Sequence, residues 1–255
     1  MIKNIYGMLH QVCTQNKDRI FFVRQNETYA DLLRRVKQRA VLLAKKFGVK
    51  RGDTVAILSG NTPDFIRSYF AITSQGARVL MLDTGLSTAE HVNMIRRTGC
   101  KLVLAQREYF INRCRGVKMF DIENLDDTDA REFKPASATR NDIAMLSFTS
   151  GSTGNPKVVG LTHDNILSLG AGALFYEPVI HPGYTFYGFL PLYHIYGVVI
   201  NIIAPLVLRG KLLLQPVLNP REFLADFKQY KPEVIPAVPR IWETFYKRII
   251  DTAKE

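Results

Sequence analysis

The sequence has few cysteines, and the pattern they form matches no metal site. Its 255 residues contain Cys13, Cys100 and Cys114, and an odd number of cysteines leaves at least one thiol unpaired. Reduced thiols are typical of intracellular proteins, so we expect a cytoplasmic protein. The first residues lack an apolar core followed by small cleavage-site residues, which argues against a signal peptide.

Negative charge is also scarce, since 34 lysine and arginine residues outnumber 23 acidic ones and give a formal net charge of +11. Such an excess suits an anionic ligand, a membrane surface or a nucleic acid. Much of it lies in residues 34–51, where a helix would carry an apolar stripe formed by Leu32, Val36, Ala40, Leu43 and Phe47. The basic residues of this segment should then lie largely on its other, solvated faces: Arg34, Arg35, Arg39 and Lys45. No interleaved aromatic residues or zinc-knuckle spacing accompany them, so we expect no nucleic-acid partner.

One long segment lacks charge altogether. No Asp, Glu, Lys or Arg occurs in residues 185–208, a length that is sufficient to span a bilayer. Prolines and glycines interrupt it, among them Pro191, Gly197 and Pro205, and they disfavour a continuous helix. We therefore expect a strand, a loop and a buried helix in series and no transmembrane segment. An integral membrane protein is the alternative, and the positive charge is compatible with peripheral membrane contact. The sequence predicts no oligomeric state.

Short apolar segments alternate with amphipathic ones along the chain. Residues 54–58, 78–82, 101–105 and 117–122 are typical of strands, and capping signals at Asn61-Thr62-Pro63 and Ser87-Thr88-Ala89-Glu90 predict helices between them. A second run predicts strands at 185–190, 211–215 and 234–237, with helices at 197–208, 220–230 and from Pro239 onward. Residues 123–142 lack periodicity and indicate a surface linker. This alternation predicts an α/β fold with mainly parallel sheets and helices on their faces.

Between these two runs, the chain has a strand–loop–strand segment suited to a polyphosphate. Apolar residues 143–148 lead into Thr149-Ser150-Gly151-Ser152-Thr153-Gly154-Asn155-Pro156-Lys157, and residues 158–161 are apolar again. The hydroxyls can donate hydrogen bonds, the glycines allow close backbone approach, and Lys157 supplies a positive charge. The segment lacks the G-x-x-x-x-G-K-[ST] pattern of the common phosphate loop, and no acidic residue occurs in residues 143–161. A Ser/Gly-rich surface loop is the alternative.

The loop also resembles a known family. Together with Leu161-Thr162-His163-x-Asn165, it is similar to the phosphate loop of the adenylate-forming superfamily, which includes acyl-CoA synthetases, luciferases and peptide-synthetase adenylation domains. The run from Phe189 to Gly197 resembles the family's second motif, in which a histidine or equivalent aromatic lies beside the acyl and nucleotide pockets. The string Val238-Pro239-Arg240-Ile241-Trp242-Glu243 looks most like the long-chain fatty acyl-CoA synthetase branch, although we expect Trp242 itself to be a core residue.

The resemblance implies the following roles. Thr149, Ser150, Gly151, Ser152, Thr153, Gly154 and Lys157 would bind ATP, and Thr149 would contact Mg²⁺. Lys157 and His194 would be catalytic, with Tyr193 and His194 binding a fatty acid that is activated and passed to CoA. No general base is required, because a carboxylic acid is already ionised at neutral pH. A histidine in an apolar run is otherwise more often a hydrogen-bonded core residue.

The resemblance also implies how the chain is organised. Residues 51–175, with the phosphate loop at 147–157, would form one α/β subdomain, and residues 1–50 plus 176–255 a second. The family's Tyr-Gly-x-Thr-Glu motif and its small C-terminal lid domain are absent from the sequence, so we expect an N-terminal part that is catalytically incomplete. Two alternatives stay open: adenylation of another acid, such as an aromatic or amino acid, and a non-catalytic nucleotide-binding module.

Overall fold

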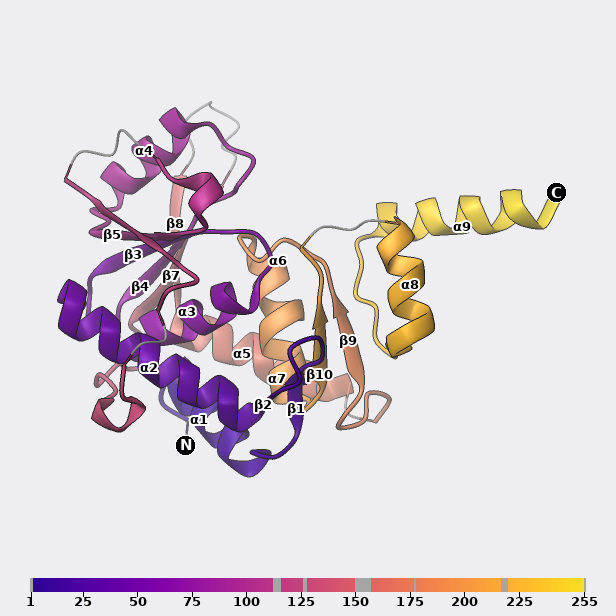
Figure 1. Cartoon of the computed structure of the whole chain (residues 1–255), viewed down its shortest axis with the longest axis horizontal. Coiled ribbons are helices and arrows are strands. Elements are labelled where there is room, and N and C mark those ends of the chain that lie inside the picture. The colour runs from indigo at the N-terminus through magenta and orange to yellow at the C-terminus, as the bar shows by residue number, and fades with distance from the viewer. Residues whose placement is uncertain are drawn as a thin grey trace.

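The computed structural model describes residues 2–111, 116–125, 128–149, 157–176, 178–216 and 220–254. Two sheets organise these residues, a six-stranded one with the order β6-β5-β3-β4-β7-β8 and a four-stranded one with the order β2-β1-β10-β9 (Figure 1). The six-stranded sheet consists of β3 (Thr54–Leu58), β4 (Arg78–Met81), β5 (Leu102–Ala105), β6 (Lys118–Asp121), β7 (Ile143–Thr149) and β8 (Lys157–Thr162). The other consists of β1 (Ile20–Phe22), β2 (Glu27–Thr28), β9 (Thr185–Gly188) and β10 (Lys211–Leu214).

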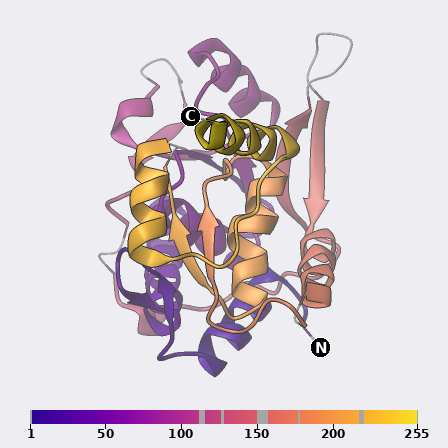
Figure 2. The ribbon, with the colours of Figure 1, turned by 90° about the vertical axis from the view of Figure 1, so that its right-hand side faces the viewer.

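Helices connect these strands and cover the sheets. They are α1 (Ile5–Gln15), α2 (Tyr29–Phe47), α3 (Pro63–Ser74), α4 (Thr88–Arg97), α5 (His163–Ala173), α6 (Ile195–Val198), α7 (Ala204–Val207), α8 (Pro220–Tyr230) and α9 (Pro239–Lys254). Shorter turns are η1 (Arg107–Tyr109), η2 (Ala130–Glu132), η3 (Leu174–Tyr176) and the π-helical η4 (Val199–Ile203). Figure 2 looks onto the side of the molecule that carries α8 and α9.

Most strand pairs are parallel, which confirms the predicted fold class. β3 pairs in parallel with β4 and β5, β4 with β7, and β10 with β1 and β9. Antiparallel pairs occur only at one edge of each described sheet, between β1 and β2 and between β7 and β8. The carboxyl ends of the parallel strands therefore share one edge of each sheet, which is where open α/β sheets bind ligands.

The capping signals form as the sequence predicts. Ser87 and Glu90 make a reciprocal capping box at the start of α4. At α3 the capping residue is Thr62, with Pro63 at the first helical position. The local sequence thus determines where these helices begin.

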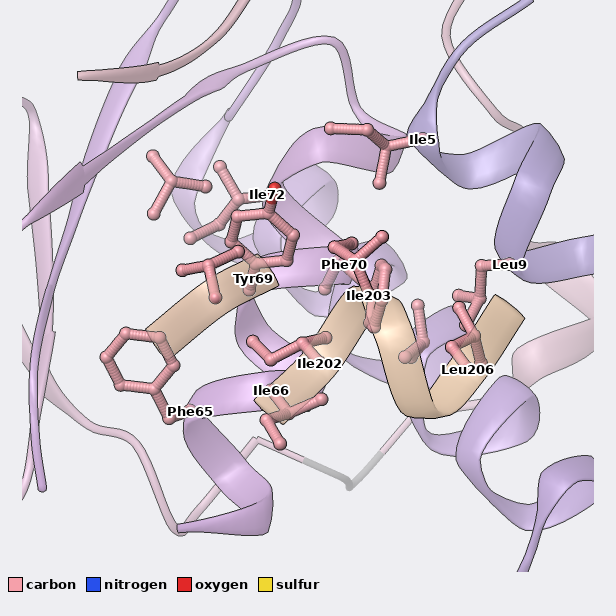
Figure 3. Close-up of a cluster of buried hydrophobic side chains, with 14 of the residues drawn as sticks. Ile5, Leu9, Phe65, Ile66, Tyr69, Phe70, Ile72, Ile202, Ile203 and Leu206 are labelled. Carbon is pink, nitrogen blue, oxygen red and sulfur yellow. The ribbon is translucent and has the colours of Figure 1, made fainter. Parts of the chain in front are cut away.

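The four-stranded sheet joins distant parts of the chain, because β1 and β2 precede residue 29 while β9 and β10 follow residue 184. One cluster of buried side chains contains residues from strands of both sheets. Helix α3 lies within it and is buried along its length from Phe65 to Ser74. Figure 3 shows part of this cluster, to which α3 contributes Phe70, α1 contributes Ile5 and Leu9, and η4 contributes Ile203. Because the sheets share this core, the division into two subdomains stays a prediction.

The uncharged segment has the predicted order of a strand, a loop and buried helical turns. The helix is nevertheless divided into α6, η4 and α7, because Pro205 at the second position of α7 has no N–H to donate. In the described part of the chain, no helix combines the length and the apolar character needed to cross a membrane.

Three predictions are wrong, one about a strand and two about single side chains. The strand expected at residues 234–237 is reduced to one bridge between Phe186 and Val234, since Pro236 cannot donate the next ladder hydrogen bond. Trp242 is 46% exposed, so it is not a core residue. Arg39 is fully buried between α2 and α3, where its guanidinium donates to the Asp64 carbonyl (2.9 Å) and the Ser68 hydroxyl (3.0 Å) and forms an ion pair with the Asp64 carboxylate.

Of the three cysteines, Cys13 and Cys100 are buried, and the Cys100 thiol donates a hydrogen bond to the Leu102 carbonyl (3.1 Å). Burial raises the pKa of the Cys13 thiol, which keeps it protonated and unreactive. Cys114 lies outside the described residues.

Candidate functional site

The strands that flank the predicted phosphate loop form a hairpin. β7 and β8 pair in antiparallel register, with Phe148 opposite Val158 and Thr149 opposite Lys157. Directly opposed residues of an antiparallel pair project their side chains from the same face, about 5 Å apart at Cβ. Thr149 and Lys157 are both exposed. The structure therefore brings the Thr149 hydroxyl and the Lys157 ammonium group, which flank the loop, together where the two strands of the hairpin meet the loop.

Five residues of the predicted nucleotide site lie outside the described residues: Ser150, Gly151, Ser152, Thr153 and Gly154. Their roles stay predictions. The strands on either side of these residues are described. Because β7 runs parallel to β4, it ends at the carboxyl edge of the six-stranded sheet.

The carboxyl ends of β3 and β5 are linked at this same edge. The Gln106 side-chain oxygen accepts hydrogen bonds from the Ser59 hydroxyl (3.0 Å) and from the Gly60 N–H (2.9 Å). These contacts hold the turn that follows β3, and the next residue of this turn is Asn61. Asn61 belongs to the predicted capping signal of α3, but Thr62 is the residue that caps the helix, and the Asn61 side chain bonds elsewhere.

Asn61 joins the carboxyl edges of the two sheets. Its side-chain amide donates to the carbonyl oxygens of Leu190 (3.0 Å) and Gln215 (3.1 Å), which follow β9 and β10. Its side-chain oxygen accepts from the Leu192 N–H (2.9 Å). Asn61 is 4% exposed, so these bonds form away from water and leave little freedom to the segment that leads to His194.

The predicted substrate residues Tyr193 and His194 lie directly after this anchored segment. The His194 N–H donates to the Pro191 carbonyl (3.2 Å), and the imidazole is exposed and lies against the Tyr193 ring at 4.7 Å between centroids. This turn requires a glycine at position 197, since a Cβ atom there would lie 2.0 Å from the Pro191 oxygen. His194 is therefore a surface residue at the start of α6 and not a core histidine.

Tyr193 packs against the core cluster that both sheets share. Burial, followed by the charge of Asp83 and hydrogen bonding to its carboxylate, raises the pKa of the Tyr193 hydroxyl, so the phenol stays protonated at neutral pH. Asp83 follows the carboxyl end of β4, the strand that lies between β3 and β7. The hairpin end and the His194 turn thus both lie along the carboxyl edge of the six-stranded sheet.

The described residues alone do not form a metal centre. No group of three or more His, Cys, Asp or Glu side chains with metal-binding geometry occurs among them. Thr149 offers Mg²⁺ one hydroxyl oxygen, whereas protein-bound Mg²⁺ normally takes one or two carboxylates together with substrate phosphates and water. The donor set thus suits Mg²⁺ only when phosphate oxygens complete it.

Comparison with known proteins identifies one family over nearly the whole chain. The family described as "AMP-binding enzyme" matches residues 9–254. A 2-succinylbenzoate–CoA ligase from Bacillus velezensis is 30% identical over 190 residues, which cover 72% of this chain and 38% of that protein. The 4-coumarate–CoA ligase-like 8 protein from Arabidopsis thaliana is 28% identical over 87% of this chain and 44% of its own length. The chain thus spans about two-fifths of the length of these relatives.

Among solved structures, the o-succinylbenzoate coenzyme A synthetase from Bacillus subtilis in complex with ATP and magnesium ion superposes with a TM-score of 0.80. The match covers 94% of this chain and 65% of that one at 23% identity, so it supports the fold alone. Both curated relatives are named for aromatic acids. These comparisons support an acid–CoA ligase relationship and give no support to a long-chain fatty acid.

Proposed function

Because the chain belongs to the AMP-binding enzyme family, we propose that it forms the nucleotide-binding part of an ATP-dependent acid–CoA ligase. In the first step, a carboxylate oxygen of the acid bonds to the α-phosphorus of ATP, and the bond to the leaving pyrophosphate breaks. In the second, the thiol of CoA attacks the acyl carbon, loses its proton and displaces AMP. The pairing of Thr149 with Lys157 at the carboxyl edge is the observation that carries this proposal.

Lys157 and Thr149 act on the β- and γ-phosphates. As pyrophosphate leaves, negative charge builds up on its oxygens, and the positive charge of Lys157 at the start of β8 stabilises that change. The hairpin holds both residues on a rigid element, because β7 is hydrogen-bonded to β4 on one side and to β8 on the other. Mg²⁺ would arrive with the nucleotide, supply further charge neutralisation and take the Thr149 hydroxyl as a ligand.

His194 and Tyr193 contact the acid. The exposed imidazole and the protonated Tyr193 hydroxyl form a polar and aromatic surface at the start of α6. Such a surface suits the ring of an aromatic acid, since aromatic rings stack on one another.

We propose an aromatic carboxylic acid as the substrate class. The names of the curated relatives favour it. The string 238–243 resembles the long-chain fatty acid branch, but neither of these relatives is named for a fatty acid. A panel of aromatic and aliphatic acids, tested for protection of the chain against unfolding in the presence of Mg²⁺ and ATP, separates the two classes.

Calorimetry tests the nucleotide site. Lys157→Ala should weaken binding of Mg²⁺-ATP about 10- to 100-fold, as expected for loss of a charge-assisted contact. Lys50→Ala is the matched control, because Lys50 is also exposed but precedes β3 at the opposite edge of the sheet. Equal affinity of the two variants would remove the phosphate role of Lys157.

A further inference from the structure

The backbone that leads to His194 is held by the opposite sheet. Asn61 uses both amide hydrogens and its oxygen in bonds to Leu190, Gln215 and Leu192. The Leu190 carbonyl accepts a second amide, that of Asn201 in η4 (2.7 Å). Two buried asparagines from different elements thus fix one peptide group, four residues before His194.

A second contact acts on the side chain next to His194. Tyr193 packs against the core cluster that both sheets share, and its hydroxyl is near enough to Asp83 for the charge of that carboxylate and a hydrogen bond to it to raise the pKa of the phenol. Asp83 is itself held in place. Its Oδ1 accepts a hydrogen bond from the Gly85 N–H (2.8 Å), and its backbone carbonyl accepts one from Nε2 of the buried His91 (2.7 Å). The Tyr193 ring therefore has a fixed support, and the His194 imidazole lies against that ring.

Neither Asn61 nor Asp83 is on the element that carries His194. Asn61 follows β3 and Asp83 follows β4, whereas His194 follows β9 in the other sheet. The two contacts act on successive parts of one turn: Asn61 on the backbone of residues 190 and 192, and Asp83 on the side chain of Tyr193. The turn is compact, because Gly197 allows α6 to approach the Pro191 carbonyl closely.

We propose that Asn61 and Asp83 are positioning residues that set the place and orientation of the His194 imidazole from the carboxyl edge of the six-stranded sheet. The role in acid binding rests on the proposed function, whereas the positioning itself does not. A side chain that must meet a bound acid with little tolerance needs such support from a second layer of contacts. Because the same sheet edge carries Thr149 and Lys157, this arrangement fixes the acid site relative to the phosphate site.

Nuclear magnetic resonance of the five histidines in the chain tests the positioning directly. The Cε1–H signal of His194 is assigned by its loss in His194→Gln. Asp83→Ala and Tyr193→Phe should each move this signal and leave those of His10 and His181 in place, and Asp83→Asn, which keeps an oxygen acceptor, should move it less. Asp18→Ala, at an exposed acidic residue in another part of the chain, is the control.

Asn61→Ala should also speed hydrogen exchange of the Leu192 amide, which loses its acceptor. If that variant does not fold, the Asp83 and Tyr193 variants decide the question. A His194 signal that stays in place in both Asp83→Ala and Tyr193→Phe would overturn the proposal.

A binding measurement separates this inference from the proposed function. With Mg²⁺ and ATP present, Asp83→Ala should weaken binding of 4-coumarate, used as the aromatic probe, about tenfold and leave ATP affinity unchanged within about twofold. Failure of the unmodified chain to bind ATP at all would contradict the proposed function, while the histidine signals would still decide whether Asn61 and Asp83 position His194.

Discussion

The buried His163 predicts how stability depends on pH. Its side chain is fully buried, and its Nδ1 accepts a hydrogen bond from the Ile5 N–H (3.2 Å) at the start of α1. The ring is therefore neutral, with its proton on Nε2, for which the described residues provide no partner. Burial lowers the pKa of His163 from 6.5 to about 4, and Asp142 opposes this shift only in part.

The sign and size follow from linkage. Between about pH 4 and pH 6.5 the unfolded chain binds a proton at this histidine and the folded chain does not, so stability falls as the pH decreases through this window. The difference between 6.5 and 4 is about 2.5 pH units, which corresponds to an upper limit of about 3 kcal/mol at 1.36 kcal/mol per unit. Above pH 6.5 the contribution is complete. Carboxylates with lowered pKa values, such as Asp142, act mainly below this window.

Urea unfolding across this pH range measures the effect. In His163→Asn, the side-chain oxygen takes the place of Nδ1 as acceptor for the Ile5 N–H but does not titrate. This variant should lose some stability at every pH through the smaller volume, and its stability should depend less on pH than that of the unmodified chain. His10→Asn, at an exposed histidine, should keep the original pH dependence. An unchanged slope in His163→Asn would refute the reasoning.

Three further predictions concern packing, charge and capping. Gly197→Ala should destabilise the fold by about 1–3 kcal/mol, because the added Cβ atom would overlap the Pro191 oxygen. Gly172→Ala in helix α5 should instead stabilise it by about 0.5–1 kcal/mol, because a Cβ atom there meets nothing within 4 Å. Urea unfolding midpoints of the two variants measure both effects. Arg67→Met should cost about 3–5 kcal/mol by leaving the buried Glu27 carboxylate without its main partner, and a double-mutant cycle with Glu27→Gln should show that the two costs do not add. Ser87→Ala should cost about 1 kcal/mol by removing the cap of α4, and equal thermal midpoints for this variant and the unmodified chain would contradict the cap's role.

Local signals in the sequence predict most of the framework. The strands that became β3, β4 and β5 are apolar runs between capping residues and glycines, and their parallel pairing follows from that alternation. Arg39 was misplaced because its burial depends on Asp64, a partner that the stripe of apolar residues on α2 does not reveal. The strand at 234–237 fails at Pro236, whose missing N–H outweighs the apolar pattern around it.

The candidate site was predicted only in part. The motifs named Thr149, Lys157, Tyr193 and His194, since each belongs to a short contiguous pattern. Asn61 and the contact of Asp83 with Tyr193 depend on how two sheets meet, and no short pattern encodes them. The position of Asn61 at the carboxyl end of a predicted strand was the available signal.

The central claim is that the end of the β7–β8 hairpin binds the β- and γ-phosphates of ATP. Comparing AMP with ATP tests it most directly, because AMP lacks those two phosphates. Calorimetry of both nucleotides with Mg²⁺, on the unmodified chain and on Lys157→Ala, should show ATP affinity reduced about 10-fold or more and AMP affinity nearly unchanged. Equal losses for AMP and ATP, or no loss for either, would contradict the account.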